Sequence, residues 1–197
     1  MQKKLAAELL GTFTLALVVL GTASLIDPVL ATPVAAALVL GLFVYSIGNI
    51  SGAHINPAVT AGLWSIRKID TPTAIQYMVA QCIGALAAFF VAGALVGGLS
   101  LGIIPESLPV FWAELIGMTL FTFGIAAVVY GKVANMASGL VIGGSLLLGI
   151  VLAVALGSAG ILNPAVGLAV GSVSLSYIAG AVLGSMLGMN LYRYLTI

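Results

Sequence analysis

Side chains able to do chemistry are few in this sequence, and the clearest of them belong to a triplet, Asn-Pro-Ala, that occurs twice. The two copies are Asn56, Pro57 and Ala58, and Asn163, Pro164 and Ala165. Asparagine is a favoured N-cap and proline is favoured at the first helical position, so each triplet predicts the start of a short helix. A helix N-terminus carries unpaired N–H groups and about half an elementary positive charge. Two such ends facing each other would repel cations, and the asparagine amides would donate hydrogen bonds to a neutral polar solute.

The other reactive residue types are too sparse for catalysis. His54 and Cys82 are the single histidine and the single cysteine of the chain. Neither a metal site nor an internal disulfide can be built from one residue of each kind. We therefore expect no catalytic residue, no metal and no cofactor, and the chain is not expected to be an enzyme.

The composition indicates what surrounds these residues. Of 197 residues, 62% are hydrophobic and only 6% are charged, and the mean hydropathy is +1.28. So many apolar side chains exclude a water-soluble globule and make the lipid bilayer the expected partner. The net charge of +1 excludes a nucleic-acid-binding protein as well, because such proteins need clustered lysine and arginine.

Breaks in the apolar pattern predict an all-α polytopic membrane protein with six spans, since one span needs about 20 residues. The predicted spans are 5–25, 33–50, 73–97, 109–130, 137–157 and 174–195. Two further segments, 51–64 and 157–171, hold the triplets and are too short to cross the bilayer. Irregular backbone at membrane depth is tolerated only in the protein interior or along a water-filled cavity, so both are predicted to be re-entrant half-helices.

The two halves of the chain repeat each other. Glu8 lies in the pattern Ala-Glu-Leu-Leu-Gly, which recurs as Ala-Glu-Leu-Ile-Gly around Glu114, 106 residues later, and the triplets recur after 107. Because each half has three spans, the second half enters the membrane from the opposite face, which makes this an inverted repeat. We expect a single channel domain, 1–197, with halves 1–100 and 106–197 and a functional site where the halves meet.

The basic residues predict the orientation of the spans. All six fall on the same side of the membrane as the N-terminus: Lys3, Lys4, Arg67, Lys68, Lys132 and Arg193. Lysine and arginine are retained on the cytoplasmic side of short loops. The sequence therefore predicts a multi-pass protein of the cell membrane, inner or plasma, with both termini in the cytoplasm.

The segment SGAHINPAVT, the paired triplets, the paired glutamates and the run YMVAQ at 77–81 together resemble the aquaporin and glycerol-facilitator family, the major intrinsic proteins. The resemblance implies a homotetramer of independent pores and passive, single-file permeation of small neutral solutes. It also implies that Glu8 and Glu114 accept hydrogen bonds from the re-entrant backbone, with a proton relay as the alternative. His54 is implied to lie in a segment lining the inner vestibule, with pH-dependent gating as the alternative.

The predicted selectivity filter departs from the family pattern. The family places an arginine three positions after the second asparagine, where this chain has Val166. Ungapped counting places the other filter positions at Ala36, Val151 and Gly160, and none of these is aromatic, charged or a histidine. Such a filter would be wide and apolar, and it would lack the positive barrier of the arginine.

These observations predict a passive channel for small uncharged solutes. The candidate solutes are water, glycerol-like polyols, urea, ammonia, gases and neutral metalloid or arsenical species. The alternative is an ion-coupled secondary transporter of a small polar solute, because inverted repeats and broken helices occur in transporters too. That alternative would depend on Glu8 and Glu114 as the coupling groups.

Overall fold

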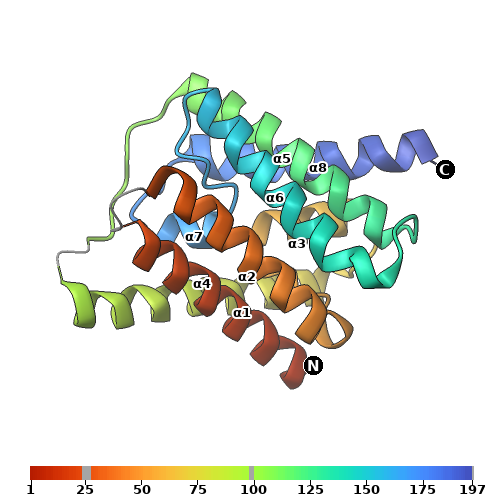
Figure 1. Ribbon diagram of the computed structural model, residues 1–197, viewed down its shortest axis with the longest axis horizontal. Coiled ribbons are helices and arrows are strands. Elements are labelled where there is room, and N and C mark those ends of the chain that lie inside the picture. The colour runs from red at the N-terminus through yellow and green to blue at the C-terminus, as the bar shows by residue number, and fades with distance from the viewer. Residues whose placement is uncertain (24–27, 98–99, 197) are drawn as a thin grey trace.

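The computed structural model describes residues 1–23, 28–97 and 100–196, and it is built of helices. Six long helices are apolar enough to cross a membrane. They are α1 (Gln2–Thr22), α2 (Pro28–Ser51), α4 (Thr71–Val96), α5 (Leu108–Val129), α6 (Ser138–Ala155) and α8 (Leu175–Thr196). Two short helices, α3 (Pro57–Ser65) and α7 (Pro164–Ala169), follow the Asn-Pro-Ala asparagines, and a 3-10 turn, η1 (Asn135–Ala137), precedes α6. Figure 1 shows α3 and α7 enclosed by the six long helices.

The prediction of six spans and two re-entrant half-helices is confirmed. The largest difference is at α2, which begins at Pro28 rather than at Pro33. Pro28 takes the first helical position, where its missing N–H has no consequence, and Pro33 lies inside the helix. The predicted end of the first span, Leu25, lies outside the described residues.

Polar caps followed by proline define the starts of α4 and α5. The Asp70 carboxylate accepts a hydrogen bond from the Thr73 N–H at 2.7 Å, and the Ser107 hydroxyl oxygen accepts one from the Val110 N–H at 3.4 Å. In both helices a proline stands in the first two helical positions. These caps satisfy N–H groups that a helix end leaves unpaired.

Glycines let the long helices of each half approach closely. A Cβ added at Gly84 would lie 2.3 Å from the carbonyl oxygen of Leu9, and one added at Gly184 would lie 2.4 Å from that of Leu115. These two contacts join α4 to α1 and α8 to α5, so the halves of the repeat pack in the same way. Small residues at a helix crossing allow this close backbone contact in membranes.

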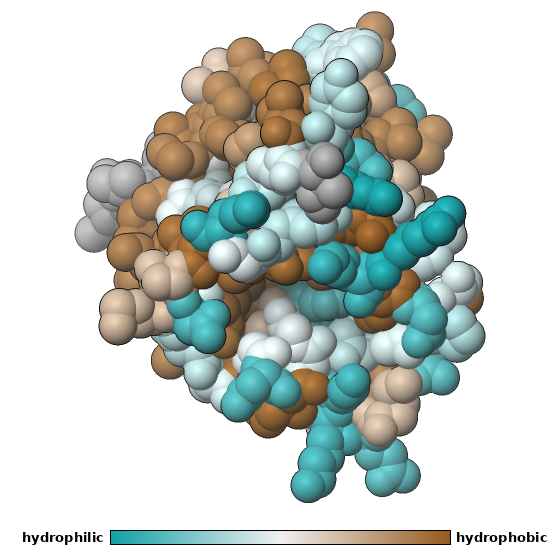
Figure 2. Space-filling model, turned by 90° about the vertical axis from the view of Figure 1, so that its right-hand side faces the viewer, coloured by the Kyte–Doolittle hydropathy of each residue, from teal (hydrophilic) through white to brown (hydrophobic). Residues whose placement is uncertain are grey.

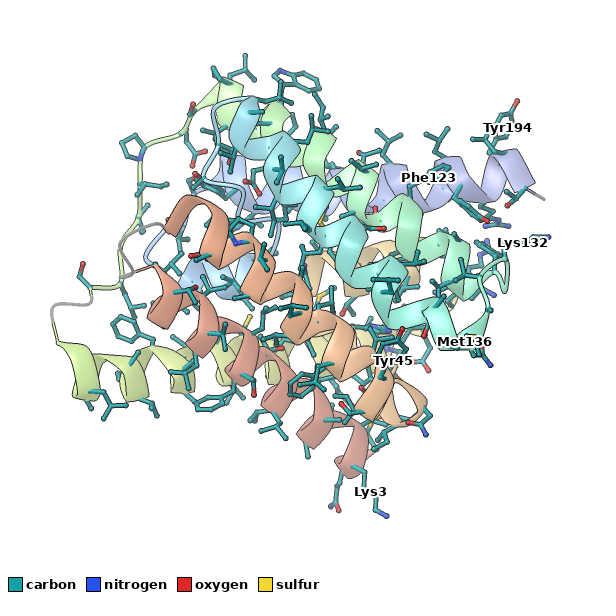
Figure 3. All side chains as sticks on the ribbon, in the orientation of Figure 1. Lys3, Tyr45, Phe123, Lys132, Met136 and Tyr194 are labelled. Carbon is teal, nitrogen blue, oxygen red and sulfur yellow. The ribbon has the colours of Figure 1, made fainter. Side chains whose placement is uncertain are left out.

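One end of the molecule gathers its hydrophilic residues. In Figure 3, Lys3, Lys132 and Tyr194 lie toward the same end of the bundle, where both chain termini are also found. Viewed from that end, hydrophilic residues surround a hollow in the surface (Figure 2). The side surfaces of the bundle instead expose large apolar side chains such as Leu38, Phe90 and Leu95, as a lipid-facing wall requires.

Candidate permeation site

The two Asn-Pro-Ala asparagines cap the half-helices as predicted. The side-chain oxygen of Asn56 accepts hydrogen bonds from the N–H groups of Ala58 at 2.8 Å and Val59 at 3.4 Å. The oxygen of Asn163 accepts equivalent bonds from Ala165 at 3.0 Å and Val166 at 3.3 Å. Each cap fixes the side chain, so the amide nitrogen of each asparagine points away from its own helix.

The amide nitrogens join the two halves of the repeat, which the sequence reasoning missed. Asn56 Nδ2 donates to the carbonyl oxygen of Leu162 at 2.9 Å, and Asn163 Nδ2 donates to that of Ile55 at 3.0 Å. An amide nitrogen carries two N–H groups, and among the described residues no second acceptor contacts either one. Since the opposite loop takes one N–H of each asparagine, each side chain keeps one N–H rather than two for a solute.

Glu8 holds the first re-entrant loop by its backbone. Its Oε1 accepts from the Ser51 hydroxyl at 2.6 Å and the His54 N–H at 3.0 Å. Its Oε2 accepts from the Ile55 N–H at 2.7 Å and the Gln81 amide at 2.8 Å. The carboxylate is fully buried, and these four donors take the place of the water molecules that it loses on burial.

Glu114 performs the equivalent task in the second half. Its Oε1 accepts from the Ser158 hydroxyl and from the Ile161 N–H at 2.9 Å, and its Oε2 accepts from the Leu162 N–H at 2.7 Å. Both glutamates thus bind the re-entrant backbone, as the resemblance implied. The halves differ because Gln81 has no polar counterpart: Ala181 stands at the matching position of α8.

Both loops contain non-glycine residues in the left-handed region of backbone conformation. The φ angles are 50° at Ala53, 40° at Ile55 and 50° at Leu162. Left-handed geometry costs about 1–2 kcal/mol for such a residue. Ile55 and Leu162 are also the residues whose N–H groups bind the glutamates and whose carbonyls accept from the asparagines. The glutamates therefore hold the strained backbone that aims these carbonyls.

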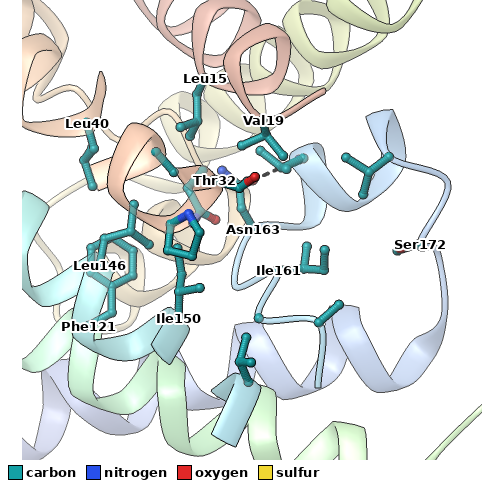
Figure 4. A pocket seen from close by; sticks show the side chains of 18 of the residues that line it. Leu15, Val19, Thr32, Leu40, Phe121, Leu146, Ile150, Ile161, Asn163 and Ser172 are labelled. Atoms are coloured by element: carbon teal, nitrogen blue, oxygen red, sulfur yellow. Dashed lines mark hydrogen bonds between the residues drawn. The ribbon is translucent and has the colours of Figure 1, made fainter. Parts of the chain in front are cut away.

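A cavity of about 420 Å³, which we call the outer cavity, is lined by both Asn-Pro-Ala asparagines (Figure 4). Three of the predicted filter residues, Ala36, Gly160 and Val166, line it together with Asn56 and Asn163. Thr32, Ser158 and Ser172 also line it. Among the described residues that line this cavity there is no lysine, arginine, aspartate or glutamate.

The predicted position of Val151 has to be corrected. Val151 is 49% exposed and shares the outward face of α6 with Leu148, whereas Ile150 and Val154 line the cavity. Both of these side chains approach Gly160, where an added Cβ would lie 3.0 Å from each. Ungapped counting gave Val151 instead of the neighbouring Ile150, and a shift of one residue along an α-helix turns the side chain by about 100°.

A second cavity, of about 640 Å³, which we call the inner cavity, opens toward the hydrophilic end. Leu40, His54 and Phe121 line both cavities and therefore stand at the neck between them. His54 Nδ1 lies 3.1 Å from Thr60 Oγ1, and the His54 ring contacts Tyr77 edge-on at 5.1 Å between centroids. These contacts fix the imidazole as part of the wall of the inner cavity.

Sequence reasoning missed Ile150, Val154, Leu40 and Phe121 as lining residues. Each face of α6 is apolar, so hydrophobic periodicity gives no signal that separates lumen from lipid. Gln81, the last residue of the run YMVAQ, is fully buried. A polar residue at membrane depth needs a partner, and that rule could have joined Gln81 to Glu8.

The comparisons with known proteins agree with this geometry. The model of the family "Major intrinsic protein" matches residues 1–192. Aquaporin AqpM of Methanothermobacter thermautotrophicus is 30% identical over 177 residues, which are 78% of this chain and 71% of that protein. Glycerol uptake facilitator protein-like 6 of Lactiplantibacillus plantarum is 40% identical over 122 residues, which are 60% of this chain and 51% of that protein.

A solved structure shows the same fold. The X-ray structure of the aquaglyceroporin from Plasmodium falciparum superposes with a TM-score of 0.72 at 23% identity, covering 98% of this chain and 93% of that one. Fold, paired asparagine caps and family model all lead to one assignment. The chain belongs to the major intrinsic protein family, the aquaporin and glycerol-facilitator channels.

Proposed function

We propose that this channel passes small uncharged solutes larger than water, with glycerol-like polyols and urea as the leading class. The observation that carries the proposal is the outer cavity, whose filter region is formed by Ala36, Gly160, Val166, Ile150 and Val154. Two of these side chains are a methyl group and a hydrogen atom, and none carries a charge. Ammonia, gases and neutral metalloid or arsenical species belong to the same solute class.

The lining suits a solute with both polar and apolar surface. One N–H from Asn56 and one from Asn163 offer hydrogen bonds on one side of the path, while Ile150 and Val154 face the solute with hydrocarbon. A polyol can place its hydroxyl groups on the polar side and its CH groups on the apolar side. The names of the two relatives, an aquaporin and a glycerol uptake facilitator, fit this class of solute.

The same lining does not favour ions. An apolar filter offers no ligands to replace the hydration shell of an ion, and the positive ends of α3 and α7 both point at the centre of the path. Ion-coupled transport is not supported either. Glu8 and Glu114 are fully buried and are absent from the lining of both cavities, and they accept four and three hydrogen bonds from the protein.

The assembly and the orientation are also part of the proposal. We infer a homotetramer of independent pores and a cytoplasmic location of both termini, which makes the hydrophilic end of Figure 2 the cytoplasmic face. The basic residues on this side support the orientation. Native mass spectrometry of the protein in lipid nanodiscs tests the first statement, and protease access to a C-terminal tag in intact cells tests the second.

The decisive experiment is stopped-flow light scattering of proteoliposomes with water, glycerol, urea and a neutral arsenic species. Val166→Arg and Val154→Phe both add bulk to the filter, so glycerol and urea permeability should fall on the order of tenfold or more. Val151→Phe adds the same ring on the outward face of α6 and should leave both permeabilities unchanged. Equal glycerol permeability in wild type and Val154→Phe would contradict the proposed path.

A further inference from the structure

The re-entrant arrangement has an electrostatic consequence at the inner cavity. Because α3 points its N-terminus at the membrane centre, its C-terminus at Ser65 must point toward the cytoplasmic face. A helix C-terminus carries about half a negative charge, and its last carbonyls attract cations. Left alone, this end would concentrate cations at the mouth of a channel for neutral solutes.

The chain turns sharply where α3 ends and directs a lysine to the inner cavity. The Ile66 N–H donates to the Gly62 carbonyl at 3.2 Å, and the Lys68 N–H donates to the Leu63 carbonyl at 2.9 Å. Between them Arg67 adopts a left-handed φ of 62°. Lys68 thereby becomes part of the lining of the inner cavity, which Arg67 does not, and both residues also line a surface depression beside Trp64.

The Lys68 ammonium group is held in place by aromatic rings. Its Nζ lies 4.7 Å from the centroid of the Tyr130 ring, and Tyr130 stacks on Tyr192 with centroids 6.0 Å apart. A cation over a tyrosine face at this distance is attracted by the ring quadrupole. The contact joins the turn after α3 to the end of α5 and places the exposed ammonium group at the mouth of the inner cavity.

Lys68 is exceptional in the permeation path. Among the described residues that line the two cavities, no other is a lysine, an arginine, an aspartate or a glutamate. The outer filter has Val166 and no formal charge. The fixed positive charge of the path therefore lies at the cytoplasmic mouth, in front of the neck formed by Leu40, His54 and Phe121.

We propose that Lys68 is a specificity-determining residue, which offsets the negative end of α3 and repels cations from the cytoplasmic mouth. The proposal rests on the proposed function as a channel for neutral solutes. Charges near a protein surface interact strongly at a few ångströms, and salt screens them over about 10 Å at 0.1 M. Lys68 should therefore reduce the uptake of cations without affecting the uptake of neutral solutes, and the reduction should be stronger at low ionic strength.

Urea and guanidinium form a matched pair of probes, because they are similar in shape and differ in charge. Uptake of each into proteoliposomes is compared for wild type, Lys68→Met, Lys68→Glu and Arg67→Met. We expect Lys68→Glu to raise guanidinium uptake on the order of tenfold at low salt, with a smaller rise for Lys68→Met. Urea uptake should stay unchanged in all four proteins, and Arg67→Met should match wild type for both probes.

Three outcomes would overturn the role of Lys68. Guanidinium uptake by Lys68→Glu equal to that of wild type at low salt is one. A guanidinium rise of the same size in Arg67→Met is another, because it would indicate a general surface effect. Parallel loss of urea uptake in both Lys68 variants is the third, because it would indicate a collapsed mouth. Urea and glycerol uptake by wild type reports separately on the proposed function, since neither solute is charged.

Discussion

The Glu8 carboxylate accepts one backbone hydrogen bond on each oxygen, from the His54 N–H on Oε1 and from the Ile55 N–H on Oε2. In a Glu8→Gln variant one of these oxygens becomes an NH₂ group, which cannot accept. The Ser51 hydroxyl and the Gln81 amide can rotate to adapt to the change, but a backbone N–H cannot. Whichever way the new amide turns, one buried backbone N–H therefore faces another donor.

The expected cost follows from this count. A buried donor left without an acceptor costs about 1–3 kcal/mol. The remaining bonds weaken from about 1.5–3 kcal/mol with a charged acceptor to about 0.5–1.5 kcal/mol with a neutral one. Removing a buried charge returns part of this loss, because its desolvation no longer opposes folding. We expect a net loss of about 2–4 kcal/mol in the free energy of unfolding.

Thermal unfolding of the purified protein in detergent measures the loss. For a chain of this length the midpoint should fall by about 5 °C or more. Glu106→Gln is the matched control, because Glu106 also accepts two backbone N–H groups, from Leu175 and Ser176, but lies in an exposed loop where water can replace the lost acceptor. If Glu8→Gln lowered the midpoint no more than Glu106→Gln does, the reasoning from buried N–H groups would be refuted.

Two further predictions concern packing and pH. Gly184→Ala should lower the free energy of unfolding by about 1–3 kcal/mol, because its Cβ would meet the Leu115 carbonyl oxygen at 2.4 Å. Gly144→Ala is the control and should leave the free energy of unfolding unchanged, since nothing lies within 4 Å of its Cβ. Equal midpoints for the two variants in thermal unfolding would contradict this prediction. Hydrogen bonds from the Ser176 hydroxyl and from the backbone hold the pKa of Glu106 below its ordinary value. A lowered folded-state pKa contributes stability above the ordinary carboxyl range, and this contribution is lost as pH falls through the lowered value. The difference in midpoint between wild type and Glu106→Gln, which should be smaller than that for Glu8→Gln, should therefore be present at neutral pH and vanish in acid.

Local sequence signals predicted most of the architecture. Apolar length alone is enough to identify six spans, because a lipid core requires about 20 apolar residues in every helix that crosses it. Asn56 and Asn163 identify the half-helix starts, because an N-cap followed by proline acts over neighbouring residues only. Ala36, Gly160 and Val166 line the outer cavity, and their place in the selectivity filter stays a prediction.

Only the tertiary structure decided which way a side chain points from an apolar helix and which residues meet across the two halves of the repeat. Lipid and lumen are both compatible with hydrocarbon, so only packing shows that Ile150 and Val154, rather than Val151, line the path. The bonds from Asn56 and Asn163 to the opposite loop join residues more than 100 positions apart, and no local pattern carries them. Lys68 likewise looked like one of six orienting charges, and only the turn after α3 and the Tyr130 ring place it in the cavity wall.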